Sequence, residues 1–598
     1  MQNYPSGGRA PHKKKKKRRG VRWEKVLGYT AILIVATAAI FFALNLISNR
    51  QQKTPGQTPV LPQILPVKEP EKVILTGYLK SGGELISVYD DEGGLVAELV
   101  RGTEVTYEED TATEDGKQLV RFSGEEGGME GYVRSDEIAD DLQKVITETE
   151  GYVRTSVDMI ADPETGQLSV MAAKGTHLEI LGFDRLEKDG SVHEYRVRMT
   201  NDAGEETEAF IRPIYLVETA EDVDAIYDEG IQAIHNTRQD RYGGGDGASL
   251  DYYPREKGSF EDNVMPDECR TLYMNCSKET IAQVDEYIAI ADQCGINAFV
   301  VDIEDGGLKG YASPWMQEHA PSCYSSAQSS LEDYGAAIKK LKDAGYYVIG
   351  RLVVFADSQL ITDHPEYAIQ DTSGNPLKIS GEYWPSVFCR DAWEYKVGLA
   401  KEAVELFGFN EIQFDYVRFP NGTYDMERAG TIDFLNTYGE TKAQGVQRFL
   451  MYATDEMHDT GVYVAADVFG ETSNDYVSSY GQYWPAVSTV VDVISAMPYP
   501  DHYGEYNGWK PWEHPYDIIT TWGNGAKIRQ LETLSPAKVR TWIQAYNAIR
   551  PPYNTYGPDE VGAEIRALRD CGFHDGYMAW HGASSLDKYR SLMSAFDL

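Results

Sequence analysis

Five segments in the C-terminal part of the chain share one pattern of apolar and polar positions. Each ends a helical pattern at a glycine and then runs through a nearly continuous apolar stretch: CGINAFVVDIED from Cys294, AGYYVIGRLVVF from Ala344, FGFNEIQFDYVRFP from Phe407, TGVYVAADVFG from Thr460 and CGFHDGYMAWHG from Cys571. Glycine after a helix provides a left-handed C-cap, and an apolar run without alternation is typical of a parallel strand covered on both faces. The pattern predicts repeated helix–strand units.

Eight strands are predicted in this region, at residues 271–275, 298–304, 347–355, 411–416, 462–467, 491–496, 540–546 and 576–580. Helical patterns lie between them, including 331–344, 392–407, 446–458 and 558–571, and Ser277 is predicted to cap the first helix. Eight such units indicate a closed (β/α)₈ TIM barrel over 269–598. The alternative is an open doubly wound sheet, but the glycine-rich phosphate loop typical of that fold is absent.

Polar or aromatic residues follow these glycines by six to eight positions: Asp302, Arg351, Asp415, Asp467 and Trp580. At about 3.3 Å per residue, this distance places each of them at the carboxyl end of its strand. Active sites of TIM barrels are built at that end. The same pattern therefore predicts both the fold and the location of the chemistry.

The fourth and fifth strands carry the predicted catalytic residues. In EIQFDYVRFP, alternation places Gln413 and Asp415 on one side, and the fifth strand delivers Asp467 in the same way. Glycoside hydrolysis needs two carboxyl groups, one to protonate the leaving oxygen and one to act as nucleophile or base. Crowding keeps one of the two protonated. We predict Asp415 and Asp467 as this pair, with Glu471 as the alternative acid/base.

The other residues predicted at this end would bind substrate. Alternation in VVDIED is expected to direct its two inward acids to the same side of the second strand. Aromatic faces can stack on sugar rings, while amide, guanidinium and carboxylate groups can bind hydroxyls. The predicted binding set is Asp302, Glu304, Arg351, Arg418, Tyr499, Gln544 and Trp580.

The FDYVRFP and ADVFG strands, with the barrel around them, resemble a family of bacterial glycoside hydrolases with a membrane anchor. The likeness covers residues 268–595. It implies a hydrolase of O-glycosyl bonds without a cofactor, with Asp415 at the nucleophile position of retaining barrels and Asp467 as acid/base. Many amylase-type enzymes place a Glu at the latter position. The alternative is a non-catalytic protein that binds glycans or the cell wall through a degenerate barrel.

The chain repeats itself between residues 73–143 and 150–218. Gly102-Thr103 matches Gly175-Thr176, and the segment 131–134 matches 209–212. Short alternating strands separated by turn residues predict two small all-β domains. They resemble bacterial SH3-like domains, which implies either contact with peptidoglycan or packing on the catalytic domain; spacer modules that bind nothing are the alternative. Residues 219–268, rich in glycine and aromatic residues, are predicted to connect them to the barrel.

The N-terminal segment, residues 1–72, predicts a membrane anchor. Residues 1–25 carry a basic block, 26–47 form an uncharged apolar stretch, and 48–72 are a Pro-rich linker. A helix that rises about 1.5 Å per residue would cross the ~30 Å hydrocarbon core over this stretch, and the preceding positive charge would hold the N-terminus in the cytoplasm. A cleaved signal peptide is the alternative. We expect a single-pass protein of the cell membrane with most of the chain extracellular.

Net charge and cysteine spacing bear on the partners, disulfides and metal sites that the chain can have. The formal net charge of −38 argues against a nucleic-acid partner, because a polyanion would be repelled. The six cysteines form no C-x-x-C pair; a bridge between Cys269 and Cys571 and buried free thiols are both open. No metal is predicted, and the alternative is a Ca²⁺ or Mg²⁺ ion held by Asp302, Glu304 and Asp305.

Overall fold

The computed structural model describes residues 72–124, 127–201, 203–225 and 227–598. The predicted basic tail, membrane span and most of the linker lie outside these residues. None of the helices within the described ranges is long and apolar enough to span a bilayer. Residues Val73 to Leu598 form one unit, which contains two small sheets and the predicted barrel.

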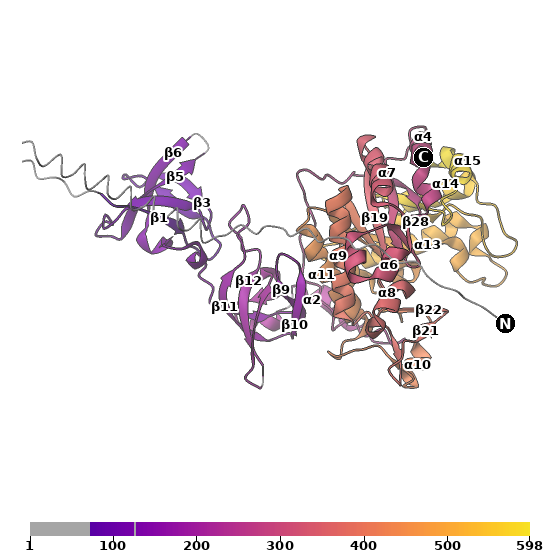
Figure 1. Ribbon diagram of the computed structural model, residues 1–598, viewed down its shortest axis with the longest axis horizontal. Coiled ribbons are helices and arrows are strands. Elements are labelled where there is room, and N and C mark those ends of the chain that lie inside the picture. The colour runs from indigo at the N-terminus through magenta and orange to yellow at the C-terminus, as the bar shows by residue number, and fades with distance from the viewer. Residues whose placement is uncertain (1–71, 125–126, 202, 226) are drawn as a thin grey trace, which may run out of the picture. The chain divides into compact units, whose positions relative to one another are not determined.

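Two antiparallel sheets precede the barrel (Figure 1). The first contains β1 (Ile74–Leu79), β2 (Ile86–Tyr89), β3 (Leu95–Leu99), β4 (Glu104–Glu108), β5 (Lys117–Gly124), β6 (Gly127–Arg134) and β7 (Ile138–Ala139). The second contains β8 (Glu150–Val153), β9 (Val157–Asp162), β10 (Gln167–Ala172), β11 (His177–Phe183), β12 (Tyr195–Thr200), β13 (Glu206–Ile211) and β14 (Leu216–Val217). We call them the first and second repeat.

The two repeats have the same topology. Their strand orders, β3-β2-β6-β5-β4-β1-β7 and β10-β9-β13-β12-β11-β8-β14, correspond strand for strand. Gly102 and Gly175 have φ angles of 82° and 85°, in the left-handed region that glycine tolerates. The Gly102 amide donates to the Leu79 carbonyl at 2.8 Å, and the Gly175 amide donates to the Val153 carbonyl at 2.7 Å. The internal repeat read from the sequence is therefore present in the fold.

The connector between the second repeat and the barrel contacts the barrel. It contains α2 (Glu229–Asn236). His235 on this helix stacks on the Tyr252 ring at 3.6 Å, and its Nδ1 lies 3.0 Å from the hydroxyl of Tyr483. Further along, the ammonium of Lys257 donates to three backbone carbonyls at 2.7–2.8 Å, those of Ser488, Thr489 and Val491. These contacts fasten the connector to the barrel.

Nine parallel strands of the described chain form a near-closed, TIM-like barrel. They are β15 (Cys269–Met274), β16 (Ala298–Asp305), β19 (Tyr347–Val353), β23 (Glu411–Asp415), β25 (Tyr463–Phe469), β26 (Val493–Met497), β27 (Lys538–Val539), β28 (Thr541–Gln544) and β29 (Gly576–Trp580). Strand β15 pairs with both β16 and β29, so the first and last strands are neighbours. β27 and β28 flank Arg540 in one continuous segment and pair with β26 and β29, respectively.

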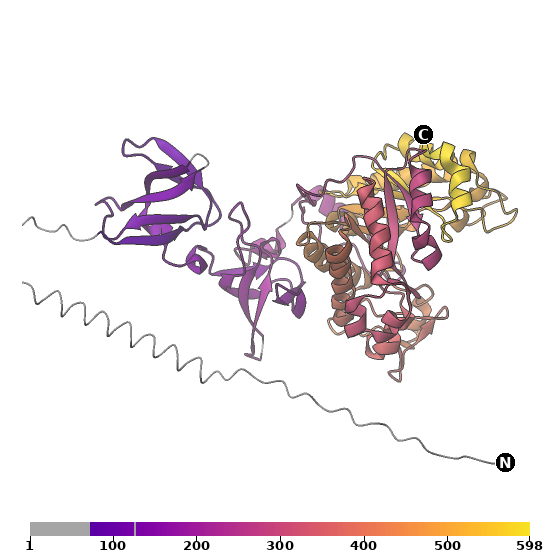
Figure 2. The same ribbon diagram turned by 45° about the horizontal axis from the view of Figure 1, so that its top comes forward.

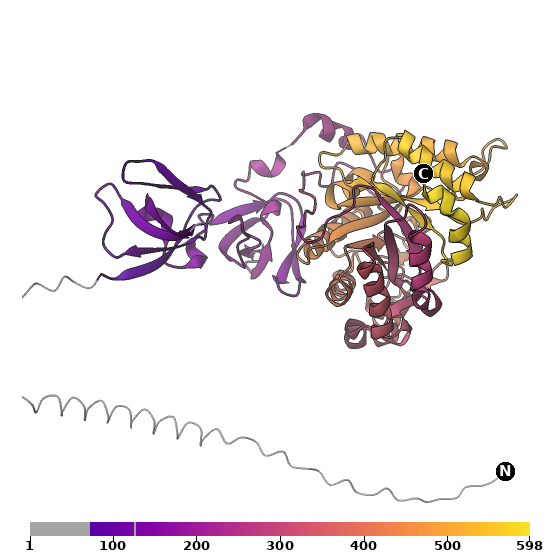
Figure 3. The same ribbon diagram turned by 90° about the horizontal axis from the view of Figure 1, so that it is seen from above.

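Helices lie outside the strands of the barrel (Figure 2, Figure 3). The helices are α3 (Lys278–Ala282), α4 (Val284–Ala291), α7 (Leu331–Asp343), α9 (Arg390–Phe407), α11 (Lys442–His458), α12 (Trp484–Val490), α13 (Pro515–Leu531), α14 (Pro558–Asp570) and α15 (Leu586–Phe596). Loops contain β17 (Leu308–Tyr311), α5 (Pro314–His319), α6 (Pro321–Ser325), β18 (Ala327–Ser329), α8 (Ser358–Asp363), β20 (Gln370–Asp371), β21 (Lys378–Ile379), β22 (Glu382–Tyr383), α10 (Tyr424–Arg428) and β24 (Ile432–Asp433).

The helix ends follow the sequence signals with one exception. Ser277 caps α3 by accepting a hydrogen bond from the Thr280 amide, as predicted. Four of the five glycines after helices have left-handed φ angles, and Gly408 after α9 is typical at 66°. Gly295 does not. A Cβ there would lie 2.6 Å from the Phe596 carbonyl oxygen, so this glycine permits a close approach of two backbones rather than a left-handed cap.

Alternation along the strands separates the barrel interior from the helix layer. Ile412 and Phe414 on β23 pack in the large core against the helices. Glu411 points inside, where its Oε1 accepts from Arg540 Nη1 at 2.7 Å, and Gln413 and Asp415 follow on the same side. The predicted orientation of this strand is confirmed. Because the strands are parallel, their inward residues at the carboxyl end converge on one place.

All six cysteines are free thiols. Cys269 is buried at the start of β15, and Cys571 follows α14 with its Sγ 3.7 Å from the Thr520 carbonyl oxygen. Of the two alternatives left open by the sequence, a bridge between these two cysteines is not formed. Buried thiols contribute to packing like other small apolar side chains.

Candidate active site at the carboxyl end of the barrel

Arg351 on β19 lies at the centre of a cluster of carboxylates inside the barrel. Its Nη1 donates to Asp302 Oδ1 at 2.7 Å, and its Nη2 donates to Asp415 Oδ2 at 2.6 Å. These partners come from the neighbouring strands β16 and β23. Nη1 also lies 3.3 Å from Asp305 Oδ1 at the end of β16. Three of the residues that the sequence placed at strand ends are thus in direct contact.

Asp467 on β25 completes this cluster. Its Oδ1 accepts hydrogen bonds from Gln413 Nε2 at 2.9 Å and from Trp542 Nε1 at 2.8 Å. Its Oδ2 has no hydrogen-bond partner and lies 3.8 Å from Nε of Arg351. We call Asp302, Arg351, Asp415 and Asp467 the acid cluster. It contains three carboxyl groups and one guanidinium, all largely removed from water.

The unequal charge of the acid cluster favours bound protons. Burial, and then the neighbouring Asp415 carboxylate, raise the pKa of Asp467 well above its usual range, and the Arg351 guanidinium only partly opposes them. Burial also raises the pKa of Asp302 to about 7. The surroundings of Asp467 therefore favour its protonated form.

Asp415 is the less enclosed member of the aspartate pair. Its side chain is 7% exposed, whereas that of Asp467 is fully enclosed. Its Oδ1 accepts from the backbone amide of Tyr416 at 2.6 Å. Tyr416 has a φ angle of 54°, which is rare for a residue other than glycine, and such strained backbone is enriched at functional sites. The chain bends here, directly after the carboxylate that faces outward.

Aromatic rings surround the guanidinium of Arg351. Its Cζ lies 5.3 Å from the centroid of the Trp580 ring, within the range of a cation–π contact. Trp580 packs on Tyr273 at 4.3 Å and on Trp542 at 5.3 Å. The Tyr273 hydroxyl hydrogen-bonds Asp302 Oδ2. Tyr273 was missed in the sequence, although the alternation of β15 already places it on the same side as Thr271 and Cys269.

Two hollows open beside the acid cluster. The first has a volume of about 350 Å³, and its lining includes Asp305, Glu382, Trp384, Tyr416, Arg418 and Asn421. The second has a volume of about 480 Å³, and its lining includes Phe469, Glu471, Tyr480, Met497, His502 and Arg550. Both contain aromatic rings next to polar groups, which is the composition that a sugar-binding surface needs.

Arg418 lies beside rings from both hollows. Its Cζ is 4.7 Å from the centroid of Tyr416 and 5.1 Å from that of Trp384, which line the first hollow. It is 4.6 Å from the centroid of Phe469, which lines the second. Arg418 was predicted to bind substrate. It lies at the rim, without a hydrogen bond to the acid cluster.

Glu304 does not join the acid cluster, contrary to the orientation expected from VVDIED. The register of β16 against β19 shifts between Asp302 and Glu304, so Glu304 turns to the helix side of the strand. There it forms an ion pair with Lys396 and lies 3.1 Å from Lys309 Nζ. Burial raises the pKa of Glu304 to about 7. The alternation was misread because a bulge cannot be recognised in this sequence.

Tyr499 and Gln544 reach the barrel interior but do not contact the carboxyl groups. Tyr499 is buried and packs 5.9 Å from the ring of Tyr546. Gln544 Oε1 accepts from the backbone amide of Asp501 at 3.2 Å, and its Nε2 donates to the Tyr546 carbonyl at 3.3 Å. Both residues support the loops after β26 and β28 in this conformation.

A family described as "Putative glycosyl hydrolase domain" matches residues 271–586, which is more than half of the chain. The chain belongs to this family. The matched range contains all four residues of the acid cluster and both hollows. Together with the geometry, membership supports a glycoside-hydrolase-like protein built on a TIM-like barrel.

Solved structures similar to this glycosyl hydrolase family member share limited sequence with it. A hypothetical protein from Ruminiclostridium thermocellum ATCC 27405 is 35% identical over 33% of this chain and 97% of its own, with a TM-score of 0.28. The glycoside hydrolase domain of PgaB (BpsB) from Bordetella bronchiseptica is 15% identical over 55% and 99%, with a TM-score of 0.40. The spore cortex-lytic enzyme SleL from Bacillus megaterium QM B1551 is 11% identical over 55% and 75%, with a TM-score of 0.34. A search of curated proteins finds no match.

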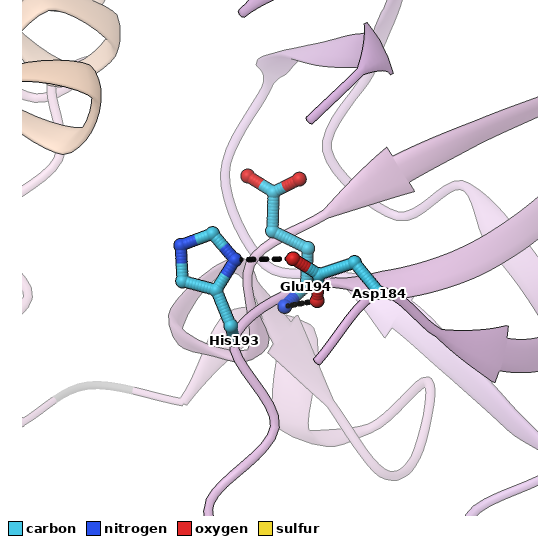
Figure 4. Close-up of side chains that lie close together, drawn as sticks. All are labelled: Asp184, His193 and Glu194. Atoms are coloured by element: carbon cyan, nitrogen blue, oxygen red, sulfur yellow. Dashed lines mark hydrogen bonds and ion pairs between the residues drawn. The ribbon is translucent and has the colours of Figure 1, made fainter. Parts of the chain in front are cut away.

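Two groups of side chains in this glycosyl hydrolase family member contain the residue types that bind metal ions. Glu304 lies on the far side of β16 from Asp302, so the trio Asp302, Glu304 and Asp305 does not converge. In the described residues, ligand atoms of Asp184, His193 and Glu194 lie within 4.8 Å of one another (Figure 4). This trio belongs to the second repeat, and Asp184 pairs with His193 at 2.6 Å instead.

Proposed function

We propose that the chain is a glycoside hydrolase that cleaves a polysaccharide by a two-carboxyl mechanism, with Asp415 as nucleophile or base and Asp467 as acid. One observation carries the proposal: Asp467 is buried beside Asp415 and its pKa is raised well above the usual range. Two adjacent carboxyl groups, one holding a proton and one ionised, form the acid/base arrangement of glycosidases. Family membership supports the same reaction class.

Asp415 is suited to the role of nucleophile or base. Arg351 donates to its Oδ2 twice, through Nη2 at 2.6 Å and Nε at 3.2 Å, and these two bonds hold the carboxyl group in place. Its side chain is less enclosed than that of Asp467 and lies next to the bend formed by Tyr416. Arg351 also holds Asp302, so that one guanidinium orients the carboxylate and balances part of the charge of the site.

Asp467 is suited to the protonated role, but a substrate must first reach it. Asp467 is paired in register with Ser495 on β26, and Met497 is the next inward residue of that strand toward the carboxyl end. Met497 also lines the second hollow. Methionine is flexible and adapts to a changing surface. We propose that displacement of the Met497 side chain brings a glycosidic oxygen from this hollow to the Asp467 proton.

Glu471 is the alternative acid. It lines the second hollow directly, and its Oε1 accepts from the Tyr476 hydroxyl at 3.0 Å. It is more accessible than Asp467, but it lacks the contact with Asp415 that keeps a proton in place. The two assignments are distinguished by the variants described in the Discussion.

The substrate would lie across both hollows. Trp384 and Tyr416 line one, Phe469 and Tyr480 line the other, and Asp415 belongs to the strand whose end leads to the rim between them. Sugar rings stack on aromatic faces while hydroxyls bind the polar groups. We propose a polymeric substrate at the cell surface or in the surroundings, in line with the predicted anchor at 26–47. A glycan-binding protein without turnover is the alternative.

The proposal is tested by release of reducing ends from a panel of purified polysaccharides, including peptidoglycan and α- and β-glucans. Wild type is expected to release reducing ends from at least one of them, while Asp415→Asn releases none and still binds that polymer. Wild-type binding without release from any polymer would support the glycan-binding alternative. Release by Asp415→Asn at the wild-type rate would refute the assigned chemistry.

A further inference from the structure

The same face of the two repeats meets different surroundings. Tyr132 pairs with Tyr89 in the first repeat, and Phe210 pairs with Ile160 in the second. Because the strand orders are identical, these pairs occupy equivalent positions. Each repeat therefore presents an apolar or aromatic pair on strands β2 and β6, or on β9 and β13, at one face of its sheet.

Cationic residues occupy equivalent positions on this face. The backbone amide of Lys80 donates to the Glu137 carbonyl at 2.7 Å, and that of Arg154 donates to the Tyr215 carbonyl at 3.0 Å. Lys80 and Arg154 are thus equivalent. Arg134 and Arg212 are also equivalent: they end the matching segments 131–134 and 209–212, two residues after Tyr132 and Phe210. The face carries two cations in each repeat.

In the second repeat, helix α11 of the barrel covers this face. Nη2 of Arg212 donates to Asp459 Oδ2 at 2.7 Å, just after the end of the helix. Asp455, one helical turn earlier, accepts from the Tyr215 hydroxyl, and Tyr452 donates to the Gly166 carbonyl at 2.9 Å. The cavity between the repeat and the helix has a volume of about 20 Å³. The acidic C-terminal end of α11 thus covers the face.

Both cations of the second repeat bind carboxylates outside the repeat, one after helix α11 and one in the connector. Arg212 binds Asp459, and Arg154 binds Asp251 of the connector at 2.6 Å. A further ion pair joins Asp158 of β9 to Arg390 of α9 at 2.9 Å. The second repeat is therefore bound to the barrel through this face, which is not available to another partner.

In the first repeat, the equivalent face forms an open groove of about 560 Å³. Its lining includes Leu85, Tyr89 and Tyr132, the cations Lys80, Lys117 and Arg134, and the acids Glu84, Asp136 and Glu137. Tyr89 is 42% exposed, and the side chains of Lys117 and Arg134 are 55% and 69% exposed. Lys117 pairs in register with Arg134, whereas in the second repeat Glu194, one residue before the Tyr195–Ile211 pair, has its Oε1 3.5 Å from Arg212 Nε. At this position the first repeat has a cation where the second has a carboxyl group.

We propose that the groove of the first repeat binds an acidic peptide segment of a partner, with two carboxylates one helical turn apart like Asp455 and Asp459. The apolar side of the segment packs on Tyr89 and Tyr132, and its carboxylates bind the exposed cations. Arg134 donates to Asp136 through Nε at 2.9 Å and through Nη2 at 2.7 Å, and both side chains are exposed. An incoming carboxylate would take the place of Asp136 in this pair.

The test uses the purified full-length chain and a fluorescent peptide with the sequence of residues 448–460, which carries Asp455, Glu456 and Asp459. A matched peptide has Asn at positions 455 and 459. Fluorescence anisotropy is expected to show saturable binding of the acidic peptide and binding at least about tenfold weaker for the Asn peptide, because each charge-assisted hydrogen bond is lost. Rising salt should weaken only the former.

Two variants locate the binding. Arg134→Gln is expected to weaken binding by about fivefold to tenfold. Lys117→Glu, which installs the acid found at the equivalent place in the second repeat, is expected to weaken it at least as much and to favour a peptide with Lys at both positions. Arg121→Gln is the matched control, because Arg121 is also exposed, pairs with Glu130 at 3.2 Å and does not line the groove.

The proposal fails if the acidic and Asn peptides bind equally, or if neither binds at low salt. It also fails if Arg121→Gln weakens binding as much as Arg134→Gln, since the loss would then reflect the net charge of the domain. Circular dichroism of each variant verifies that the repeat remains folded, and Lys117→Glu provides an independent result if Arg134→Gln is unstable.

Discussion

Two enclosed charge clusters lie on opposite sides of strand β16, and they differ in their ratio of cations to carboxyl groups. The acid cluster on the inside has three carboxyl groups for one guanidinium. On the helix side, Glu304 and Asp357 face the ammonium groups of Lys309 and Lys396, all four fully buried. We call these four the lysine cluster. A bulge in β16 decides which carboxylate joins which cluster.

We propose that this difference in the ratio of cations to carboxyl groups distinguishes a structural cluster from a catalytic one. In the lysine cluster burial opposes ionisation, but the two ammonium groups hold the pKa of Asp357 well below its usual range. In the acid cluster burial and the Asp415 carboxyl group raise the pKa of Asp467 well above its usual range. Burial also raises the pKa of Glu304 to about 7, and Glu304 and Asp467 each have one oxygen without a hydrogen-bond partner. The two clusters therefore differ in their ratio of cations to carboxyl groups, and we propose that the one with equal numbers supports the fold while the one with excess carboxyl groups carries the chemistry.

The comparison predicts the largest effect for Asp415→Asn. The substitution removes the proposed nucleophile or base but keeps the shape of the side chain, so the rate of polysaccharide cleavage is expected to fall by about 10³-fold to 10⁴-fold. Stability should change little, because the amide can remain beside Arg351. Turnover and thermal unfolding are measured on the same preparations.

Asp425→Asn is the control for this variant, since Asp425 is exposed on the short helix α10. Its activity and stability should match the wild type. A large loss of stability in Asp415→Asn without a loss of specific activity would place Asp415 in the supporting class with the lysine cluster.

The opposite result is expected for Lys396→Met. Removal of one ammonium leaves Glu304 and Asp357 to share Lys309, and an uncompensated buried charge lowers the free energy of unfolding by about 3–5 kcal/mol. Denaturant unfolding measures the loss, and the cleavage rate per folded molecule should stay near that of the wild type.

Lys339→Met serves as the control for Lys396→Met. Lys339 pairs with Asp343 on the surface of α7 at 2.6 Å, with 72% of its side chain exposed. Its loss should change stability by less than about 0.5 kcal/mol. Equal effects of both substitutions would contradict the assigned role of the buried cluster.

The sequence predicted the barrel because five of its strands repeat one local signal. Glycine, an apolar run and a polar end recur in the same order, and β29 begins and ends where this signal predicts. Asp415, Asp467 and Arg351 could be placed together because parallel strands share one carboxyl end. These predictions needed only periodicity and the direction of the strands.

Other features depend on contacts between distant segments and were not readable. The bulge after Asp302 reverses Glu304 through a register shift against β19. Gly295 is a glycine because the backbone at Phe596, at the far end of the sequence, approaches it. The packing of the second repeat on α11 depends on Asp455 and Asp459, which look like ordinary surface acids at the end of a helix. Tertiary packing sets each of these outcomes.

A smaller effect is predicted in the pH dependence of stability. The pKa of Asp467 in the folded state lies above its unfolded value of 3.8, so the folded state binds the extra proton and stability falls as pH rises through this window. The slope contributed by one such group reaches about 1.4 kcal/mol per pH unit. The Asp467→Asn substitution removes this contribution to the slope.

Unfolding of Asp467→Asn by urea, measured at several pH values, should show a flatter profile than the wild type above pH 4. At alkaline pH the variant should equal or exceed the wild type in stability, although its cleavage rate is reduced. Asp425→Asn should keep the wild-type profile. If the two profiles of wild type and Asp467→Asn are parallel, the proton is not held at Asp467.

The smallest effect is predicted for Glu471→Gln, and it sharpens the choice of the acid. Glu471 lines the second hollow but does not contact the acid cluster, so its loss removes a hydrogen-bond acceptor for Tyr476 and for substrate hydroxyls. We expect KM to rise by less than about tenfold with kcat nearly unchanged, because the lost contact binds the substrate and the transition state equally well.

A substrate with a good leaving group decides between the two candidate acids, because such a substrate needs no proton donor. It should restore activity to whichever variant has lost the donor. Rescue of Asp467→Asn, with Glu471→Gln unaffected by the leaving group, keeps the donor inside the acid cluster. Rescue of Glu471→Gln alone would move the donor to the open hollow and leave Asp467 a positioning residue for Asp415.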